Sequence, residues 1–264
     1  MIPRYTPDDM ATLWSEPERI RAWLQVELAA CRAMADEGLV PEVDVDRLES
    51  IAAETDMTAL AARAEAIERE TKHDVIAFLS AFEEVAGPPA RHVHFGLTSN
   101  DILDTSFALR LRRATDVVVE ALDGLMAAVK KQTEAHRHTP MIGRSHGVHA
   151  EPITFGLVTA SWYAELARDR RRLLAARDDI SVGKLSGAVG TNAHLPPSIE
   201  TKALSALGLE PETVATQVVA RDRHAQYFGT LATLGATLER VSVEIRHLQR
   251  TDRKSTRLNS SHYS

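Results

Sequence analysis

The stretch NDILDTSFALRLRRATDVVVEALDGLMAAVKKQTEAHR, residues 100–137, decides the fold. It contains no proline, and its large apolar residues recur at steps of three or four, the spacing of one face of an α-helix. At 1.5 Å per residue, such a helix is about 55 Å long, more than an ordinary compact domain needs. The residues that make this face are Leu103, Phe107, Leu111, Ala114, Val118, Leu122, Leu125 and Val129.

Two further long helices are predicted over residues 153–180 and 220–250. In the second of these, apolar residues alternate steps of three and four, which is typical of a coiled-coil seam. Its members are Leu231, Leu234, Leu238, Val241, Ile245 and Leu248. We therefore predict an all-α fold built around a bundle of long helices, a shape that usually packs against partners in an oligomer.

Shorter helices precede the bundle. Ser15-Glu16-Pro17-Glu18 has the form of a capping box and starts a first helix, and further helices are predicted over 44–53, 57–70 and 74–86. We expect a smaller helical amino-terminal domain over residues 1–98 and a long-helix core over 99–251. Residues 252–264 lack the apolar seam and resemble a translated sequencing adapter, so we expect them to be a non-native tail.

Composition excludes several classes of function. The chain carries 31 Lys and Arg against 37 Asp and Glu, a net charge of -6, and has no long basic run, so a nucleic-acid partner is not expected. No uncharged stretch of membrane-spanning length and no signal peptide is seen, so we expect a cytoplasmic protein without a membrane partner. A single cysteine, Cys31, excludes an internal disulfide framework.

Four polar clusters interrupt the helical pattern, at residues 72–74, 92–99, 143–152 and 217–224. His146 lies between Gly143 and Gly147, where the backbone can turn tightly and approach a ligand. Imidazole exchanges protons near neutral pH, so His146 is a candidate general acid or base. The alternative is a loop histidine that only binds backbone groups.

Histidine pairs in two of these clusters raise the question of a metal. His146 with His149, and His92 with His94, could ligate zinc or nickel through neutral imidazole. The sequence offers neither a cysteine pair nor a His-Glu-x-x-His helix to complete such a site. We therefore expect no metal.

Three more residues could bind an anion. Lys184 stands in the glycine-rich stretch 183–190, which lacks the Walker spacing, so it is either an anion ligand or a solvated charge. Thr98 and Ser99 stand where the first long helix begins. They could cap that helix, bind a carboxylate or phosphate at its positive end, or do both.

Taken together, these motifs resemble the adenylosuccinate lyase family of the fumarase and aspartase superfamily, over residues 1 to about 251. Ser145 and Lys72 are mild departures, at positions where the family usually has Thr and often has Arg. The residues that carry the resemblance are Arg4-Tyr5, Lys72-His73-Asp74-Val75, residues 93–99, residues 143–152, residues 183–191 and Arg221-Asp222-Arg223-His224.

The resemblance implies an all-α homotetramer in which loops of three subunits form each active site. It implies a β-elimination that releases fumarate from adenylosuccinate, giving AMP, and from the succinyl-carboxamide ribotide of purine synthesis. The substrate would be a small purine nucleotide, and neither a metal nor an organic cofactor is required.

The resemblance also implies residue roles. His146 would be the general acid that protonates the leaving nitrogen, and His73 would bind the substrate phosphate or orient catalysis. Lys184 would be a weaker candidate, for substrate contact or loop support. The other substrate-binding candidates are Arg4, Tyr5, Lys72, Asp74, His94, Thr98, Ser99 and Gln217.

One departure is large. The family's loop Gly-Ser-Ser-x-x-Met-Pro, which carries the serine base, does not occur in this sequence. We therefore expect the 264-residue chain to be inactive by itself. Two alternatives stay open: another lyase of the superfamily, of argininosuccinate or carboxymuconate type, and a helical interaction protein without catalysis.

Overall fold

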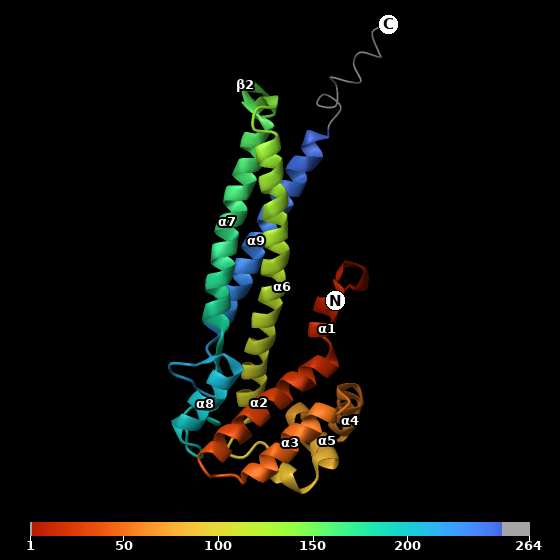
Figure 1. Cartoon of the computed structure of the whole chain (residues 1–264), viewed down its shortest axis with the longest axis vertical. Coiled ribbons are helices and arrows are strands. Elements are labelled where there is room, and N and C mark those ends of the chain that lie inside the picture. Colours follow the sequence, from red (N-terminus) through yellow and green to blue (C-terminus); the bar gives the residue numbers. More distant parts are fainter. Residues whose placement is uncertain (1, 250–264) are drawn as a thin grey trace. The chain divides into compact units, whose positions relative to one another are not determined.

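The computed structural model describes residues 2–249, and these residues contain nine α-helices and little sheet (Figure 1). The predicted all-α class is confirmed. The three long helices are α6 (Ser99–Ala135), α7 (Phe155–Ile180) and α9 (Arg221–Leu248), each within two residues of its predicted ends. The expected tail over 252–264 lies outside the described residues.

The chain divides into two compact units. Unit 1 comprises Met1–Val117 and Arg177–His224, and unit 2 comprises Val118–Ala176 and Ala225–Ser264. All three long helices run from one unit into the other, so each unit holds a part of each helix.

Unit 1 holds the shorter helices. The 3₁₀ helices are η1 (Pro3–Tyr5) and η2 (Pro88–His92), and the α-helices are α1 (Asp8–Leu13), α2 (Glu16–Asp36), α3 (Glu42–Glu54), α4 (Met57–Thr71), α5 (Asp74–Ala86) and α8 (Pro197–Leu207). A side chain caps the start of three of them: Ser15 for α2, Asp56 for α4 and His73 for α5. Each cap accepts a hydrogen bond from a backbone N–H that the helix itself leaves unpaired.

The core of unit 1 forms around α2, which packs against α3, α4 and α8. Trp23 of α2 meets Phe78 of α5 edge to face, with ring centroids 5.6 Å apart, and both side chains are buried. Ile102 of α6 and Ile199 of α8 are part of the same cluster. The first turns of α6 are thus anchored in this core.

Unit 2 is a bundle of the remaining parts of α6, α7 and α9 (Figure 1). Only part of the predicted seam of α9 is buried: Leu234 and Val241 lie in the core, whereas Leu238 and Ile245 are exposed. A three-helix core takes one narrow stripe of each helix, so alternate seam positions stay outside it. The buried members of this core are Leu122, Met126, Val129, Trp162, Leu166, Leu173, Leu234 and Val241.

The polar connections contain structure that the sequence analysis did not predict. Strands β1 (Pro140–Ser145) and β2 (Val148–Thr154) form an antiparallel hairpin in unit 2 that contains the polar cluster 143–152. In unit 1, helix α8 was also missed, and β3 (Val182–Gly183) pairs in parallel with β4 (Glu210–Pro211).

Within residues 2–249, no helix combines the length and the apolar character that crossing a membrane requires.

The buried face of α5 provides a test of this packing. Replacing Phe78 by alanine removes a fully buried ring, so we expect Phe78→Ala to lower the free energy of unfolding by about 3–5 kcal/mol. Ile76, two residues away, is 44% exposed, and Ile76→Ala should change it by no more than about 0.5 kcal/mol. Urea unfolding followed by circular dichroism measures both, and equal losses would contradict the described core.

Candidate active site

Two helices of unit 1 begin at the corner that carries the first polar cluster. His73 is the N-cap of α5, and its Nδ1 accepts a hydrogen bond of 3.3 Å from the backbone N–H of Ile76. Its Nε2 lies 3.4 Å from the hydroxyl of Ser99, the first residue of α6. Since Nδ1 is an acceptor, the neutral ring carries its proton on Nε2, which donates to Ser99. The amino-terminal ends of two helices, both positive, thus meet at one imidazole.

Lys72 and Asp74 flank this histidine at the turn between α4 and α5. Lys72 ends α4 in a left-handed conformation, and its N–H donates to the carbonyl of Glu68 over 2.8 Å. Asp74 is the first residue of α5, and one carboxylate oxygen lies 3.7 Å from Nδ1 of His73. The structure thus places both charged residues next to His73 in the turn between α4 and α5.

Asp101 organises the first turn of α6. One carboxylate oxygen binds the ammonium group of Lys184, and the other accepts the backbone N–H groups of Thr98 at 2.8 Å and Gly187 at 3.2 Å. Lys184 also donates to the carbonyl of Gly187 over 3.1 Å. Both charged side chains are fully buried. Lys184 therefore contacts the protein itself, and its position fits loop support.

A second link runs along the backbone of the same loop. The hydroxyl of Thr105, on α6, donates to the carbonyl of Lys184 over 2.9 Å and accepts its N–H over 3.0 Å. The glycine-rich stretch 183–190 is thus attached to α6 in two ways: by the ion pair of Lys184 with Asp101, and by the two hydrogen bonds between the Thr105 hydroxyl and the backbone of Lys184. Thr98, which donates to Asp101, and Ser99, which begins α6, lie at this attachment.

His94 is held by a buried carboxylate from α2. The two oxygens of Glu27 accept from Nδ1 of His94 at 2.6 Å and from its backbone N–H at 2.8 Å. Burial of the ring lowers the pKa of His94, but the hydrogen bond and charge of Glu27, with a smaller contribution from Asp101, outweigh it and raise the pKa. The imidazole is therefore biased towards its charged form, which favours an anionic ligand.

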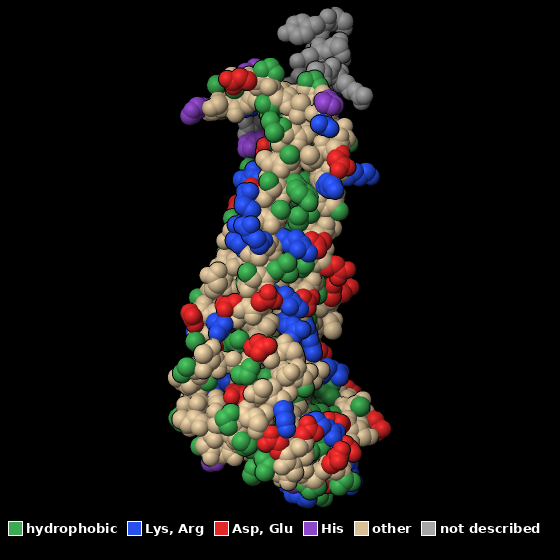
Figure 2. Space-filling model, turned by 60° about the vertical axis from the view of Figure 1, so that its left-hand side comes forward, with side chains coloured by type: hydrophobic (Ala, Val, Ile, Leu, Met, Phe, Trp, Pro, Cys, Tyr) green, Lys and Arg blue, Asp and Glu red, His purple; other side chains and the backbone are tan. Residues whose placement is uncertain are grey.

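His146 lies in unit 2, at the tip of the β1–β2 hairpin. Ser145 pairs with Val148, so His146 and Gly147 form a two-residue turn, with φ of 54° and 78°. Positive φ at both positions is typical of a type I′ turn, which accounts for the glycine. The imidazole is exposed, and Figure 2 shows histidine side chains gathered at this end of unit 2.

Backbone strain coincides with the predicted site residues. Among the described residues, four other than glycine have positive φ, and three of these are Lys72, His94 and His146. Such conformations cost free energy and cluster at functional sites. The fourth is Asn192, whose N–H donates to the carbonyl of Ser186 in the glycine-rich loop.

The other predicted residues stand apart from these contacts. Arg4 and Tyr5 form η1 and are exposed, with the guanidinium of Arg4 over the ring of Tyr5 at 4.6 Å. Gln217 is exposed in the irregular segment before α9. Within unit 1 the structure thus joins His73 with Ser99, and Thr98 with Lys184 through Asp101.

Sequence reasoning missed the two buried carboxylates that hold the site. Asp101 follows Thr98 by three residues, the spacing of a capping box, which could have identified it. Glu27 lies on the apolar stripe of α2, between Leu24 and Cys31 at helical spacing. A charged residue on an apolar stripe is buried when the helix packs and therefore needs a buried partner, so the position of Glu27 could have marked it as a supporting residue.

Comparison with known proteins shows which proteins this chain is similar to. A family model described as Lyase matches residues 4–261. The chain is 48% identical to an adenylosuccinate lyase of Synechocystis sp. over 252 residues, and 45% identical to one of Aquifex aeolicus over 253 residues. Each match covers 96% of this chain but 57% of the relative, so the chain spans little more than half the length of these relatives.

Two solved structures share the fold. A fumarate lyase from Mesorhizobium sp. BNC1 matches with a TM-score of 0.87 at 26% identity, covering 93% of this chain and 58% of that one. A 3-carboxy-cis,cis-muconate lactonizing enzyme from Pseudomonas putida matches with a TM-score of 0.84 at 30% identity, covering 95% of this chain and 58% of that one.

Removing the charge of Asp101 tests its organising role. We expect Asp101→Asn to lower the free energy of unfolding by about 3–5 kcal/mol, because it leaves the buried ammonium of Lys184 without a counter-charge. Asp123→Asn is the matched control: it breaks an exposed ion pair with Arg170 and should cost no more than about 1 kcal/mol. Urea unfolding compares them, and equal costs would contradict a special role for Asp101.

The pair of His94 and Glu27 makes stability depend on pH. The pKa of His94 is raised in the folded state, so its stabilisation is complete below the unfolded value of about 6.5 and is lost as the pH rises through the folded pKa. Glu27→Gln should lower the pKa of His94 and remove this loss. NMR titration of the imidazole and urea unfolding between about pH 6 and about pH 8.5 measure both effects. An identical pH profile in the two proteins would contradict the coupling.

Proposed function

The chain belongs to the lyase family, and on this premise we propose that it serves the cleavage of adenylosuccinate to AMP and fumarate. We extend the proposal to succinyl-aminoimidazole-carboxamide ribotide, which has the same succinyl-amine bond. The observation that carries the proposal is the contact of His73 with Ser99 where α5 and α6 begin. The identities of 48% and 45% to proteins named adenylosuccinate lyase support the choice of substrate.

Substrate binding follows from charge. The succinyl group carries two carboxylates, and the amino-terminal end of α6 is the positive end of the helix dipole and carries the hydroxyls of Thr98 and Ser99. Glu27 raises the pKa of His94, which favours a proton on both ring nitrogens, so that Nε2 can donate to a substrate oxygen. Lys72, Asp74 and His73 are proposed to contact the nucleotide, as are the more distant Arg4, Tyr5 and Gln217.

The reaction is a β-elimination without hydrolysis. A base removes the proton on the carbon beside a carboxylate, and the negative charge spreads into that carboxylate, where the cationic groups stabilise it. The carbon–nitrogen bond then breaks while an acid protonates the departing nitrogen. We assign the acid to His146, whose exposed and strained position on a two-residue turn supports contact with a ligand.

Two further parts of the proposal are the oligomeric state and the residue that removes the proton. His146 belongs to unit 2, and His73 and Ser99 belong to unit 1. We propose a homotetramer in which His146 of one subunit joins these residues of another. The base is assigned to a serine on the loop Gly-Ser-Ser-x-x-Met-Pro of the family, which this sequence does not contain, so turnover requires a polypeptide segment that supplies it.

A chimaera tests the function. Residues 1–249 of this chain, joined to the remaining part of the Synechocystis relative, should release fumarate from adenylosuccinate, whereas the 264-residue chain alone should release none. His146→Gln in the chimaera should lower kcat by about 10²- to 10⁴-fold, because the leaving nitrogen loses its proton donor. His138→Gln, an exposed histidine of the same unit, is the control.

The same assay separates the alternatives. Preferential cleavage of argininosuccinate, or turnover of a carboxymuconate, would assign the chain to another lyase of the superfamily. A folded chimaera that is inactive on all these substrates would favour a protein without catalysis. Full activity of His146→Gln would overturn the assignment of the acid.

A further inference from the structure

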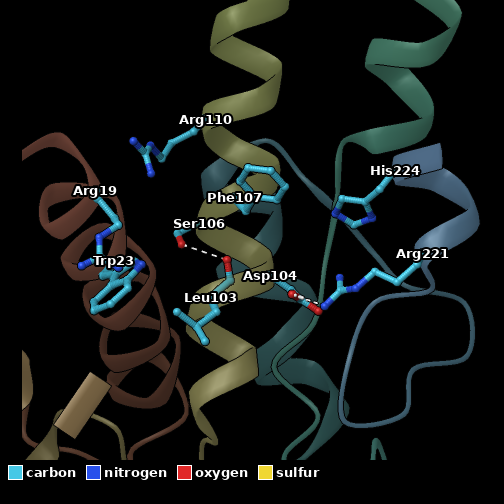
Figure 3. A pocket seen from close by; sticks show the side chains of 9 residues that line it. All are labelled: Arg19, Trp23, Leu103, Asp104, Ser106, Phe107, Arg110, Arg221 and His224. Atoms are coloured by element: carbon cyan, nitrogen blue, oxygen red, sulfur yellow. Dashed lines mark hydrogen bonds and ion pairs between the residues drawn. The ribbon is translucent and has the colours of Figure 1, made fainter. Parts of the chain in front are cut away.

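A cavity of about 440 Å³ lies in unit 1 between α2, the first turns of α6 and the start of α9 (Figure 3). Two of its lining residues are Arg221 and His224, to which the proposed function assigns no role. The size is in the range of small-molecule sites. Its walls are Arg19, Trp23, Leu103, Asp104, Ser106, Phe107, Arg110, Arg221 and His224.

Arg110 is the unusual group in this cavity. It is only 7% exposed, and its guanidinium donates two hydrogen bonds, of 3.2 and 3.0 Å, to the carbonyl of Leu13. It also lies over the ring of Trp14, 4.6 Å from the centroid. Among the residues that the structure describes, no carboxylate oxygen lies within 4 Å of it. A buried charge normally has a counter-charge, because desolvation is costly without one.

The neighbouring charges do not compensate for it. Arg19 is paired with Glu16, and Arg221 is paired with Asp104, whose second oxygen accepts the N–H of Val219. The charges of Glu16 and Glu18 also act on Arg110, but neither forms an ion pair with it, so the guanidinium has no direct counter-ion in the cavity. Burial, and after it the charge of Arg19, lower the pKa of Arg110 and outweigh the opposite effect of these two carboxylates.

Aromatic rings make up much of the cavity's lining (Figure 3). The rings of Phe107 and His224 stack with centroids 5.7 Å apart and planes within 7°, and Trp23 lines the cavity from α2. Neither ring nitrogen of His224 has a hydrogen-bond partner within the described chain. Burial, followed by the charge of Arg221, lowers the pKa of His224, which favours the neutral ring with one donor and one acceptor.

We propose that this cavity binds a small aromatic carboxylate, with the carboxylate on the guanidinium of Arg110 and the ring against Phe107 and His224. A guanidinium binds a carboxylate through two parallel hydrogen bonds. One uncompensated charge calls for a monoanion, since a phosphate dianion would leave an excess of negative charge beside Asp104. The proposed lyase reaction assigns no role to the lining residues, so this inference stands or falls independently.

Benzoate is the probe, and the 264-residue chain is the protein. Calorimetric titration at constant ionic strength should detect benzoate binding, and the melting temperature should rise with benzoate concentration. Benzamide, a neutral molecule of the same shape, should bind at least about tenfold more weakly, because it cannot neutralise Arg110. Inorganic phosphate should bind more weakly than benzoate as well.

Two variants assign the effect to Arg110. Arg110→Met should lose benzoate binding, and its melting temperature should no longer rise with benzoate concentration, because the guanidinium that holds the carboxylate has been removed. Arg110→Lys keeps the charge without the paired donors and should bind benzoate at least about tenfold more weakly. Arg63→Met, which removes an exposed guanidinium paired with Glu84, is the matched control and should bind benzoate normally.

Several results would overturn the proposal. Equal binding of benzamide and benzoate would show an apolar cavity without anion recognition. Tighter binding of phosphate would make the ligand class wrong. Unchanged benzoate binding in Arg110→Lys would exclude the paired contact even if Arg110→Met fails to fold, and absence of benzoate binding to the parent chain would exclude the site.

Discussion

A lysine ammonium that has no exposure to water needs a negative charge beside it, and in unit 1 Asp101 supplies that charge to Lys184. Because Asp101 also accepts the N–H groups of Thr98 and Gly187, one carboxylate joins the start of α6 to the glycine-rich loop. If either side chain were removed, the other would remain as a buried charge without a partner. The first turn of α6, where the candidate carboxylate-binding residues lie, is thereby held in place by a buried ion pair within the protein.

The same logic extends to the strained backbone. Lys72 and His94 keep left-handed conformations because neighbouring contacts outweigh the cost: the N–H of Lys72 closes the last turn of α4, and Glu27 holds both the ring and the N–H of His94. A relaxed backbone would turn these side chains away from the start of α5 and α6. Stability from the core of unit 1 therefore maintains local conformations that are unfavourable by themselves.

Much of the fold was predictable, because helices of this length repeat their apolar spacing many times, as in Leu103 to Val129. The β1–β2 hairpin was not, since His146-Gly147 is a weaker turn signal than Asn-Gly and the strands carry mixed polar residues. Motifs located the candidate ligand-facing residues, whereas Glu27 and Asp101, which hold them, were missed. A supporting carboxylate is defined by a partner distant in sequence, 67 residues away for Glu27 and 83 for Asp101.

An exposed histidine is useful in catalysis only if its position is defined, and the base of the hairpin provides that definition for His146. The N–H of Phe155 donates to the carbonyl of Thr139 over 3.0 Å, and the N–H of Gly156 donates to that of His136 over 2.9 Å. A side chain at Gly156 would collide with the backbone of Arg137, so only glycine allows the end of α6 and the start of α7 to approach this closely. The two strands extend from this base and, after an irregularity between Ile142 and Arg144, pair up to Ser145 and Val148, which places the turn at the end of the ladder. Solvent exposure and a defined position, which oppose each other in most loops, coexist here because the turn contains only two residues.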